Sequence, residues 1–294
     1  MKRLIIIAGP TASGKTDLAI QVAKYLNTEI ISCDSRQIFK EVSIGTAQPT
    51  QEELGRVKHH FVASHSIHDE YSAGDFEKDV ICLLNELFQR YDNVVMVGGS
   101  GLYIRAVCNG LDSFPEVNPA VRDTLNKELQ EFGVNRLFDE LQAVDPIAAA
   151  NIEGKNPQRV IRALEIFRET GKPISSFRKF EKVKRDFDIE QYVLDLPREL
   201  LYNRINQRVD FMMEAGLLDE VRSVFQFKHL NSLNTVGYKE LFEYIEDETS
   251  LEEAVELIKR NTRRYAKRQL TWFRKDEEAV WIQPPFYENI LKNI

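Results

Sequence analysis

The stretch that decides the fold is Gly9-Pro10-Thr11-Ala12-Ser13-Gly14-Lys15-Thr16, between a β-branched run at residues 4–8 and an amphipathic run at residues 17–26. Its spacing fits the phosphate-binding loop G-x-x-x-x-G-K-[S/T], which requires a strand before it and a helix after it. In such a loop, backbone N–H groups and the following helix N-terminus attract anions. Lys15 adds a cation, and the Thr16 hydroxyl can bind Mg²⁺. The sequence therefore predicts a polyphosphate site, and the loop taken alone is typical of ATP-binding proteins.

The same alternation of strand and helix continues through residues 1–110. The strand-like runs are residues 4–8, 29–33 and 94–97, and the helical runs are residues 17–26 and 75–91. Such alternation predicts a parallel sheet flanked by helices, in which ligands bind at the carboxyl ends of the strands. Polar segments follow all three strands, at residues 9–16, 34–37 and 98–101. We expect these three segments to converge on one crevice.

The pattern changes from about residue 111 to residue 190, where strand signals disappear. Helical runs begin at Asn118-Pro119, at residue 134 and at residue 156. A strand-like run then follows at residues 191–196, before helical runs at residues 198–211, 219–225, 236–245 and 251–273 and an edge strand at residues 280–282. We therefore predict an α/β protein with a core formed by residues 1–110 and 191–294, and an all-helical insertion at residues 111–190.

The composition excludes several classes of protein. No run approaches 18 apolar residues, so the sequence predicts no transmembrane helix. Met1-Lys2-Arg3 leads directly into the first strand, which leaves no room for a cleavable signal. Cys33, Cys82 and Cys108 form no C-x-x-C pair, which argues against a zinc site or a disulfide framework. We expect a cytoplasmic protein that binds no membrane.

Asp34 is the first candidate catalytic residue, because it follows the apolar strand of the same βαβ unit as the loop. In phosphate-loop enzymes an aspartate at this place can hold the metal through water or act as a base, and it can equally be a turn residue. The strand at residues 94–97 ends instead in Gly98-Gly99. Nucleoside-triphosphate hydrolases usually carry a magnesium-binding acid there, so motor and GTPase functions are disfavoured.

Basic residues gather in three places despite a net charge of −7. Residues 259–275 hold eight basic side chains and no acidic ones, and Arg260, Arg264, Lys267 and Arg268 share one face of the expected helix. Residues 178–185 hold five basic residues and one acidic residue, and Arg159 and Arg162 form a third patch. A solvated helix face is the alternative, but the excess of cations favours contact with a polyanion.

Several blocks together resemble the bacterial tRNA dimethylallyltransferase (IPP transferase) family. The matching blocks, in family order, are GPTASGKT at residues 9–16, DSRQ at 34–37 with Ile38-Phe39, IGTA at 44–47, GGSGLY at 98–103, NPQRVIRALE at 156–165, Val236-Gly237-Tyr238, and KRQLTWFR at 267–274. The resemblance implies a phosphate-loop kinase-like core with a helical insertion. It also implies transfer of a dimethylallyl group from dimethylallyl diphosphate to N6 of adenosine 37, next to the tRNA anticodon.

The resemblance also implies roles for individual residues. Residues 9–16 would bind the diphosphate, with Mg²⁺ at Thr16, Asp34 would be the general base, Arg208 would neutralise the diphosphate, and Ser100 would lie near the reacting centre. The tRNA contacts, made with the anticodon stem-loop, would come from Asp34, Ser35, Arg36, Gln37, Ser100, Arg122, Gln158, Arg159, Val160, Ile161 and Arg162. We expect the protein to act as a monomer.

This chain departs from the family at Gln48, where many members have a lysine, and residue 36 varies among members. Three other functions remain open: prenylation of a free adenine nucleotide, a nucleoside or small-molecule kinase, and a non-enzymatic RNA-binding protein. The helical insertion and the basic helix favour an RNA substrate. A purely RNA-binding protein would leave Lys15, Thr16 and Asp34 unexplained.

Overall fold

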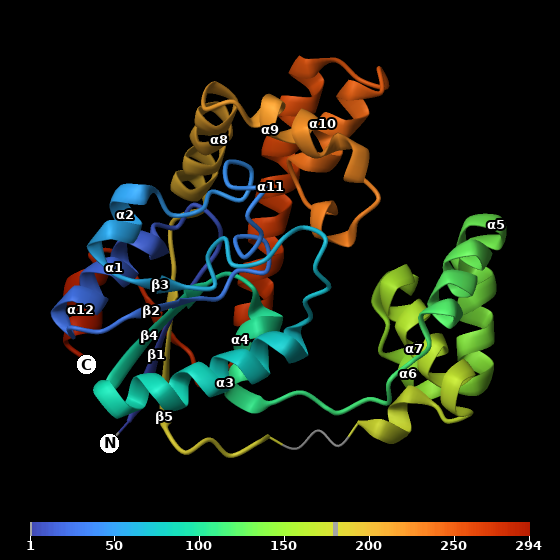
Figure 1. The fold of residues 1–294 in the computed structure, drawn as a ribbon, viewed down its shortest axis with the longest axis horizontal. Helices are drawn as coiled ribbons and strands as arrows, with labels where there is room; N and C mark the ends of the chain where they lie inside the picture. The colour runs from blue at the N-terminus through green and yellow to red at the C-terminus, as the bar shows by residue number, and fades with distance from the viewer. Residues whose placement is uncertain (1, 179–181) are drawn as a thin grey trace. The chain divides into compact units, whose positions relative to one another are not determined.

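A computed structural model describes residues 2–178 and 182–294 of the chain. The chain divides into two compact units (Figure 1). We call Met1–Asn109 with Lys184–Ile294 the core unit and Gly110–Val183 the helical unit. A strand begins at Asp188, so the helical segment ends before residue 190, where the sequence pattern had placed its boundary.

The core unit contains a six-stranded parallel sheet with the strand order β3-β2-β4-β1-β5-β6. The strands are β1 (Arg3–Ala8), β2 (Ile30–Ser32), β3 (His59–His60), β4 (Asn93–Gly98), β5 (Asp188–Leu194) and β6 (Val280–Ile282). In the centre of the sheet, Ile5 of β1 lies opposite Val95 of β4 and Glu190 of β5. The parallel sheet predicted from the alternating pattern is confirmed.

Helices cover both faces of this sheet (Figure 1). The helices of the core unit are α1 (Lys15–Tyr25), α2 (Gln51–Arg56), α3 (Ala73–Arg90), α4 (Gly101–Asn109), α8 (Arg198–Glu214), α9 (Leu217–Val224), α10 (Tyr238–Ile245), α11 (Leu251–Phe273) and α12 (Phe286–Leu291), with short 3₁₀ turns η3 (Phe225–Phe227) and η4 (Asn231–Leu233). No helix among the described residues is long and apolar enough to cross a membrane.

The β-branched run that precedes the phosphate loop explains the layers. Successive side chains of a strand point to opposite faces of the sheet. Leu4 and Ile6 of β1 pack with α3 and α4, while Ile5 and Ile7 pack with α1 and α12, and all four are fully buried. A strand buried on both faces reads as a continuous apolar run, which is what residues 4–8 show.

A third cluster of buried residues joins α8, α9, α10 and α11 to the chain segment after β2. Val209, Leu217 and Leu241 pack there with Ile38 and Phe39. This packing places α8 and α11, which carry the candidate cations, on the core unit near the segment that begins with Asp34.

The helical unit has its own apolar core. Its elements are α5 (Pro119–Val144), α6 (Pro146–Ala150), η1 (Glu153–Lys155), α7 (Pro157–Thr170) and η2 (Ile174–Phe177). Leu125 and Leu141 of α5 pack against Leu164 of α7. Arg168 of α7 ties the same helices together through Glu128 and Glu140 at 2.7 and 2.6 Å. Gly133 has a φ of +75° and interrupts α5, at the break that the sequence pattern predicts between residues 132 and 134.

Candidate active site

The phosphate loop connects β1 to α1 with the geometry of an anion site. Gly14 is the N-cap of α1 with a φ of +90°, and Ala12 has a φ of +62° in the same left-handed region. The Lys15 Nζ donates to the carbonyl of Pro10 at 3.2 Å, so its ammonium lies back over the loop. Backbone N–H groups at the start of α1 and this ammonium together form a positive pocket for an anion.

Two arginines of α8 reach the same loop. Arg208 Nη1 donates to the Thr11 hydroxyl at 3.0 Å, and Arg204 Nη1 donates to the Ser13 carbonyl at 3.4 Å. Burial first, and then the charge of Arg208, lower the pKa of Lys15 to about 8, against the opposing effect of Asp34. Burial likewise lowers the pKa of Arg208, against the effect of Asp34. The structure therefore brings Lys15, Arg208 and Asp34 together.

Asp34 lies just past the end of β2, in a tight turn. Its Oδ1 accepts hydrogen bonds from the backbone N–H groups of Arg36 and Gln37 at 2.9 and 3.3 Å. The turn thus fixes the carboxylate beside two cations. Asp34 is therefore a turn residue, which was one of the alternatives that the sequence left open. The same turn holds its carboxylate where a base could act.

Ser100 connects Asp34's turn to the end of β4. Its Oγ accepts from the Ser35 N–H at 2.9 Å and lies 3.2 Å from the Ser35 hydroxyl. The loops after β1, β2 and β4 lie on neighbouring strands of the sheet, which explains why they meet. The predicted convergence of these segments is confirmed.

The end of β4 cannot carry an acid. A Cβ atom at Gly98 would lie 1.9 Å from the carbonyl oxygen of Cys33, because β2 and β4 approach closely there. The absence of an acidic side chain at this strand end is therefore built into the backbone.

The residues after Asp34 mainly hold the local backbone. The Arg36 guanidinium donates to the carbonyls of Asn231, Ser232 and Asn234, and the Gln37 amide donates to those of Thr46 and Ala47. Gln48 donates to the carbonyls of Gln37 and Phe39 at 2.9 and 2.7 Å. All of these side-chain donors bind backbone carbonyls of the protein itself. Gln48, which stands where many family members have a lysine, therefore serves here as a hydrogen-bond donor to the backbone.

Gln269 is a site residue that the sequence reasoning missed. This buried side chain of α11 accepts from the Thr11 N–H at 2.9 Å and donates to the Gly99 carbonyl at 3.0 Å. The available signal was its position, since Ala266, Gln269, Leu270 and Phe273 follow helical spacing on the buried face of a basic helix. A polar residue on such a face needs a hydrogen-bonding partner.

Glu220 of α9 was missed as well. Its carboxylate accepts from the N–H groups of Ile44 and Gly45 at 2.7 and 2.8 Å and from the Tyr238 hydroxyl at 2.6 Å. Two of the sequence blocks that carry the resemblance, residues 44–47 and 236–238, therefore meet at one carboxylate. No spacing rule links these distant blocks, so the pattern could not reveal the contact.

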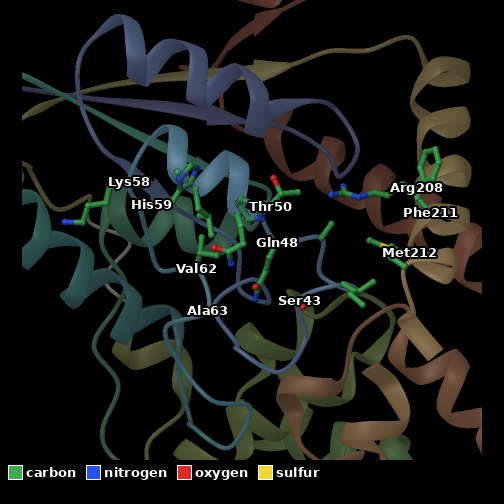
Figure 2. Close-up of a pocket in the computed structure, with 17 residues that line it drawn as sticks. Ser43, Gln48, Thr50, Lys58, His59, Val62, Ala63, Arg208, Phe211 and Met212 are labelled. Atoms are coloured by element: carbon green, nitrogen blue, oxygen red, sulfur yellow. The ribbon is translucent and has the colours of Figure 1, made fainter. Parts of the chain in front are cut away.

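A cavity of about 940 Å³ opens beside Arg208, between α8 and residues 43–63. Figure 2 shows Arg208, Phe211 and Met212 on α8 facing the segment that carries Gln48 and Thr50. Its apolar lining includes Ile44 and Leu54. The cavity is large enough for a small organic group beside Arg208, whose guanidinium contacts Thr11 of the phosphate loop.

The donors available for Mg²⁺ are those of a phosphate-loop site. Thr16 is half-buried in the first turn of α1, and the described residues contain no cluster of three His, Cys, Asp or Glu side chains that could hold a metal. Mg²⁺ commonly binds one or two protein oxygens together with phosphate oxygens and water. The Thr16 hydroxyl fits that arrangement only when a diphosphate supplies further ligands.

The helical unit carries the second group of predicted RNA contacts. Gln158 and Arg159 are exposed in the first turn of α7. Val160 and Ile161 are fully buried in the core of this unit, so the expectation that their side chains contact tRNA is corrected. Successive helical residues point about 100° apart, and α7 turns these two inward.

Arg122 and Arg162 also belong to this unit, and both lie beside the buried carboxylate of Glu165. Arg162 donates to Glu165, and Arg122 lies 3.3 Å from its other oxygen. Both guanidinium groups remain partly exposed. The pair is held in place by one acid and still presents positive charge to solvent.

The basic face of α11 is exposed as predicted. Arg260, Arg264, Lys267 and Arg268 are all accessible, whereas Lys259 pairs with Asp210 and Arg263 donates to Asn206. In the other basic run, at residues 178–185, Lys179, Phe180 and Glu181 lie outside the described residues. Arg185 of that run pairs with Glu77 at 2.7 Å and supports the core unit.

Similarity to known proteins extends over the whole chain. A model of the IPP transferase family matches residues 37–276. Proteins named tRNA dimethylallyltransferase from Christiangramia forsetii and Cytophaga hutchinsonii are 54% and 48% identical to this chain, and they cover 99% and 96% of it. The alignments span 95% and 93% of those relatives. The phosphate loop, which precedes the family-model match, is thus included in the similarity.

Solved structures agree with the sequence comparison. The full-length tRNA isopentenylpyrophosphate transferase from Bacillus halodurans superposes with a TM-score of 0.73 and 37% identity, over 100% of this chain and 94% of that one. A eukaryotic dimethylallyltransferase described as acting on tRNA gives a TM-score of 0.80 and 27% identity, over 96% and 74% of the two chains. By fold and sequence together, this chain belongs to the IPP transferase family of enzymes.

Proposed function

We propose that this enzyme transfers the dimethylallyl group of dimethylallyl diphosphate to N6 of adenosine 37 in tRNA, next to the anticodon, and releases diphosphate. The observation that carries the proposal is the meeting of Lys15, Arg208 and Asp34 at one edge of the sheet. Two cations beside a carboxylate suit a reaction that expels an anion and removes a proton. The relatives named tRNA dimethylallyltransferase support the same assignment.

In this proposal the phosphate loop binds the leaving group. The allylic C1–O bond ionises readily, and negative charge accumulates on the departing diphosphate. Lys15, Arg208 and the N–H groups at the start of α1 stabilise that charge, which is usually the largest electrostatic contribution to catalysis. Mg²⁺ held by Thr16 and the phosphate oxygens would neutralise further charge on the diphosphate.

Asp34 is the proposed general base. The adenine amine is a weak nucleophile, because its lone pair is delocalised into the ring. As the N6–C1 bond forms and the C1–O bond breaks, the nitrogen becomes cationic and loses a proton to the Asp34 carboxylate. The products are N6-dimethylallyl adenosine, diphosphate and a proton. The turn that binds Asp34 Oδ1 keeps this carboxylate oriented without a substrate.

The cavity beside Arg208 is the proposed site for the five-carbon chain. Ile44, Leu54, Phe211 and Met212 give it an apolar lining next to the cation that would hold the diphosphate. This arrangement matches the two ends of an allylic diphosphate, one apolar and one anionic. Burial of the chain would also keep water from the reacting carbon.

The proposed RNA partner is the anticodon stem-loop. The exposed cations of α11 suit the phosphates of the RNA, and Gln158 and Arg159 offer a second contact surface on the helical unit. Adenosine 37 must leave its stack to reach Asp34, which costs a few kcal/mol and least in an unpaired loop. We further propose a monomer in the cytoplasm; cysteines that form no disulfide among the described residues suit a reducing compartment.

Labelled dimethylallyl diphosphate, Mg²⁺ and an anticodon stem-loop with adenosines at positions 36–38 test this function directly. We expect label in the RNA and none when position 37 carries guanosine. Label transfer to free adenosine monophosphate would favour a nucleotide substrate instead. ATP-dependent phosphorylation of a small molecule without RNA labelling would refute the proposal in favour of a kinase.

The base is tested with Asp34→Asn. The asparagine Oδ1 still accepts from the turn N–H groups, so the loop is kept while the proton acceptor is lost. We expect kcat to fall by about 10²–10⁴-fold with little change in RNA affinity. The matched control is Asp69→Asn, because Asp69 also accepts a backbone N–H in a turn, from Ser66. A collapse of RNA binding in Asp34→Asn would identify Asp34 as a positioning residue.

A further inference from the structure

One buried side-chain amide connects the phosphate loop to the segment that follows β4. Gln269 joins the Thr11 N–H of the phosphate loop to the Gly99 carbonyl after β4, at 2.9 and 3.0 Å. Its side chain is 6% exposed, so both hydrogen bonds are shielded from water. Burying an amide without hydrogen-bonding partners is unfavourable, so this side chain favours the arrangement in which both partners are present.

The amide of Gln269 fits here only because residue 99 has no side chain. A Cβ atom at Gly99 would lie 2.2 Å from Gln269 Nε2 and 3.2 Å from the Gly9 carbonyl oxygen. Any larger residue at position 99 would therefore displace the amide. The close approach explains one glycine of the Gly98–Tyr103 block as space for a side chain of α11.

The hydrogen bonds continue from Gly99 to the base. Ser100, the next residue, accepts the Ser35 N–H at 2.9 Å, and Ser35 follows Asp34 directly. On the other side, the Thr11 hydroxyl accepts from Arg208. Gln269 thus lies at the middle of a connected path from the proposed diphosphate ligands to the proposed base.

We propose that Gln269 is a positioning residue that fixes the phosphate loop relative to the Asp34 turn, and so sets the separation of leaving group and acceptor. This inference rests on the proposed prenyl transfer. It assigns no contact between Gln269 and a substrate. The role follows because the Thr11 N–H, which belongs to the loop that the resemblance implies binds the diphosphate, donates to Gln269 in this structure.

A loose separation has a chemical consequence that a loss of folded protein does not have. When the C1–O bond breaks before N6 is in place, water attacks the allylic carbon and its proton goes to solvent. The products are then a five-carbon allylic alcohol and diphosphate. The ratio of this alcohol to prenylated RNA therefore reports the positioning, and it does not depend on how much enzyme is active.

The test is Gln269→Met, which keeps the size of the side chain and removes both hydrogen bonds. We expect the ratio of alcohol to prenylated RNA to rise about tenfold and kcat for RNA modification to fall by up to about 10²-fold, with RNA affinity changed less than threefold. Gly99→Ala should give the same change, because it displaces the amide without removing it. Gln191→Met is the matched control. Gln191 is a buried glutamine of β5, and its side chain donates to Asp276.

A ratio in Gln269→Met and Gly99→Ala equal to that of the wild type would overturn the inference, whatever the rate. A second readout does not need the reaction: amide hydrogen exchange at residues 9–16 should become faster in Gln269→Met and stay unchanged in Gln191→Met. If the wild type prenylates no RNA, the proposed function fails, and unchanged exchange would then separately refute the positioning role.

Discussion

The Lys15 side chain loses its positive charge in the mildly alkaline pH range. Burial and the nearby Arg208 together lower its pKa to about 8, against the opposing effect of Asp34. A bound diphosphate stabilises the ammonium and raises the pKa again, so binding is coupled to proton uptake once the free enzyme has lost that proton. The charged form is fully present below pH 7 and is lost as the pH rises through 8.

We therefore expect the affinity for an unreactive alkyl diphosphate to fall by about 10- to 30-fold from pH 7 to pH 9.5 at constant free Mg²⁺. The ligand itself changes little in this range, because its last phosphate pKa is about 6. Calorimetry in two buffers of different ionisation enthalpy measures both the affinity and the proton uptake.

Lys15→Met should bind weakly and with little pH dependence, whereas Lys24→Met on the exposed face of α1 should behave as the wild type. An affinity that stays constant in the wild type over this range would show that the Lys15 charge does not contribute to binding.

The site residues that could be predicted are those whose role depends on a local motif. Lys15 and Asp34 follow strand ends in sequence, so the pattern alone places them at one edge of the sheet. Gln269 could not be found in this way, because its partners are backbone groups at Thr11 and Gly99, far away in the chain. Val160 and Ile161 were assigned with their neighbours in one motif, although helix rotation turns them into the core.

At the level of elements, α9 and α10 support the wall of the cavity beside Arg208. Glu220 of α9 binds the backbone of Ile44 and Gly45, and Tyr238 of α10 donates to the same carboxylate at 2.6 Å. Ile44 lines the cavity. Packing of these helices is thus transmitted to the proposed prenyl site through one acid.

Tyr238→Phe removes the hydroxyl and leaves the ring. A hydrogen bond to a charged group contributes about 1.5–3 kcal/mol, so we expect a loss of that order in the free energy of unfolding, measured in urea. If about 1 kcal/mol of this holds the 43–48 segment in place, KM for dimethylallyl diphosphate should rise about fivefold.

The control for this variant is Tyr192→Phe. Tyr192 is also buried and donates to a glutamate, Glu190 at 3.1 Å, but it lies on β5 away from the cavity. It should lose stability and keep its KM. A similar rise of KM in both variants would mean that general destabilisation, and not the Glu220 contact, controls the cavity wall.

The elements themselves could largely be predicted, and the exceptions have physical reasons. Long periodic runs such as α3 and α11 carry enough apolar residues to define a face, and Gly133 marks the break in α5. The two-residue strand β3 and the short helix α2 are too brief for periodicity to show. The capping box of Thr50 with Glu53 was the one local sign of α2.

For the whole molecule, sheet order decides what the sequence could imply about the site. β2, β4 and β1 are neighbours in the sheet, so the three loops that follow them meet, although β1 and β4 pair residues as far apart in the chain as Arg3 and Asn93. By contrast, Arg208 of α8 and Gln269 of α11 come from the part of the chain that follows the helical unit. Their arrival at the phosphate loop depends on tertiary packing that no local pattern encodes.

Charge is also distributed unevenly over the molecule, and the net charge of −7 conceals a basic face. Arg260 and Arg264 of α11 are exposed, and neither forms an ion pair within the described part of the chain.

If this face binds RNA phosphates, each contact releases counterions, and the logarithm of the RNA-binding constant falls linearly with the logarithm of the salt concentration. We expect Arg260→Gln with Arg264→Gln to reduce the salt slope for anticodon stem-loop binding by about two, one for each phosphate contact. As a control, Lys24→Gln on α1 combined with Lys292→Gln just after α12 removes the same charge elsewhere on the core unit and should leave the slope unchanged. Fluorescence anisotropy between 50 and 200 mM salt, roughly the range in which such contacts are measurable, distinguishes the two pairs. Equal slopes in both pairs would assign RNA binding to net charge or to the helical unit, and a reduced slope in the α11 pair alone would assign it to this face.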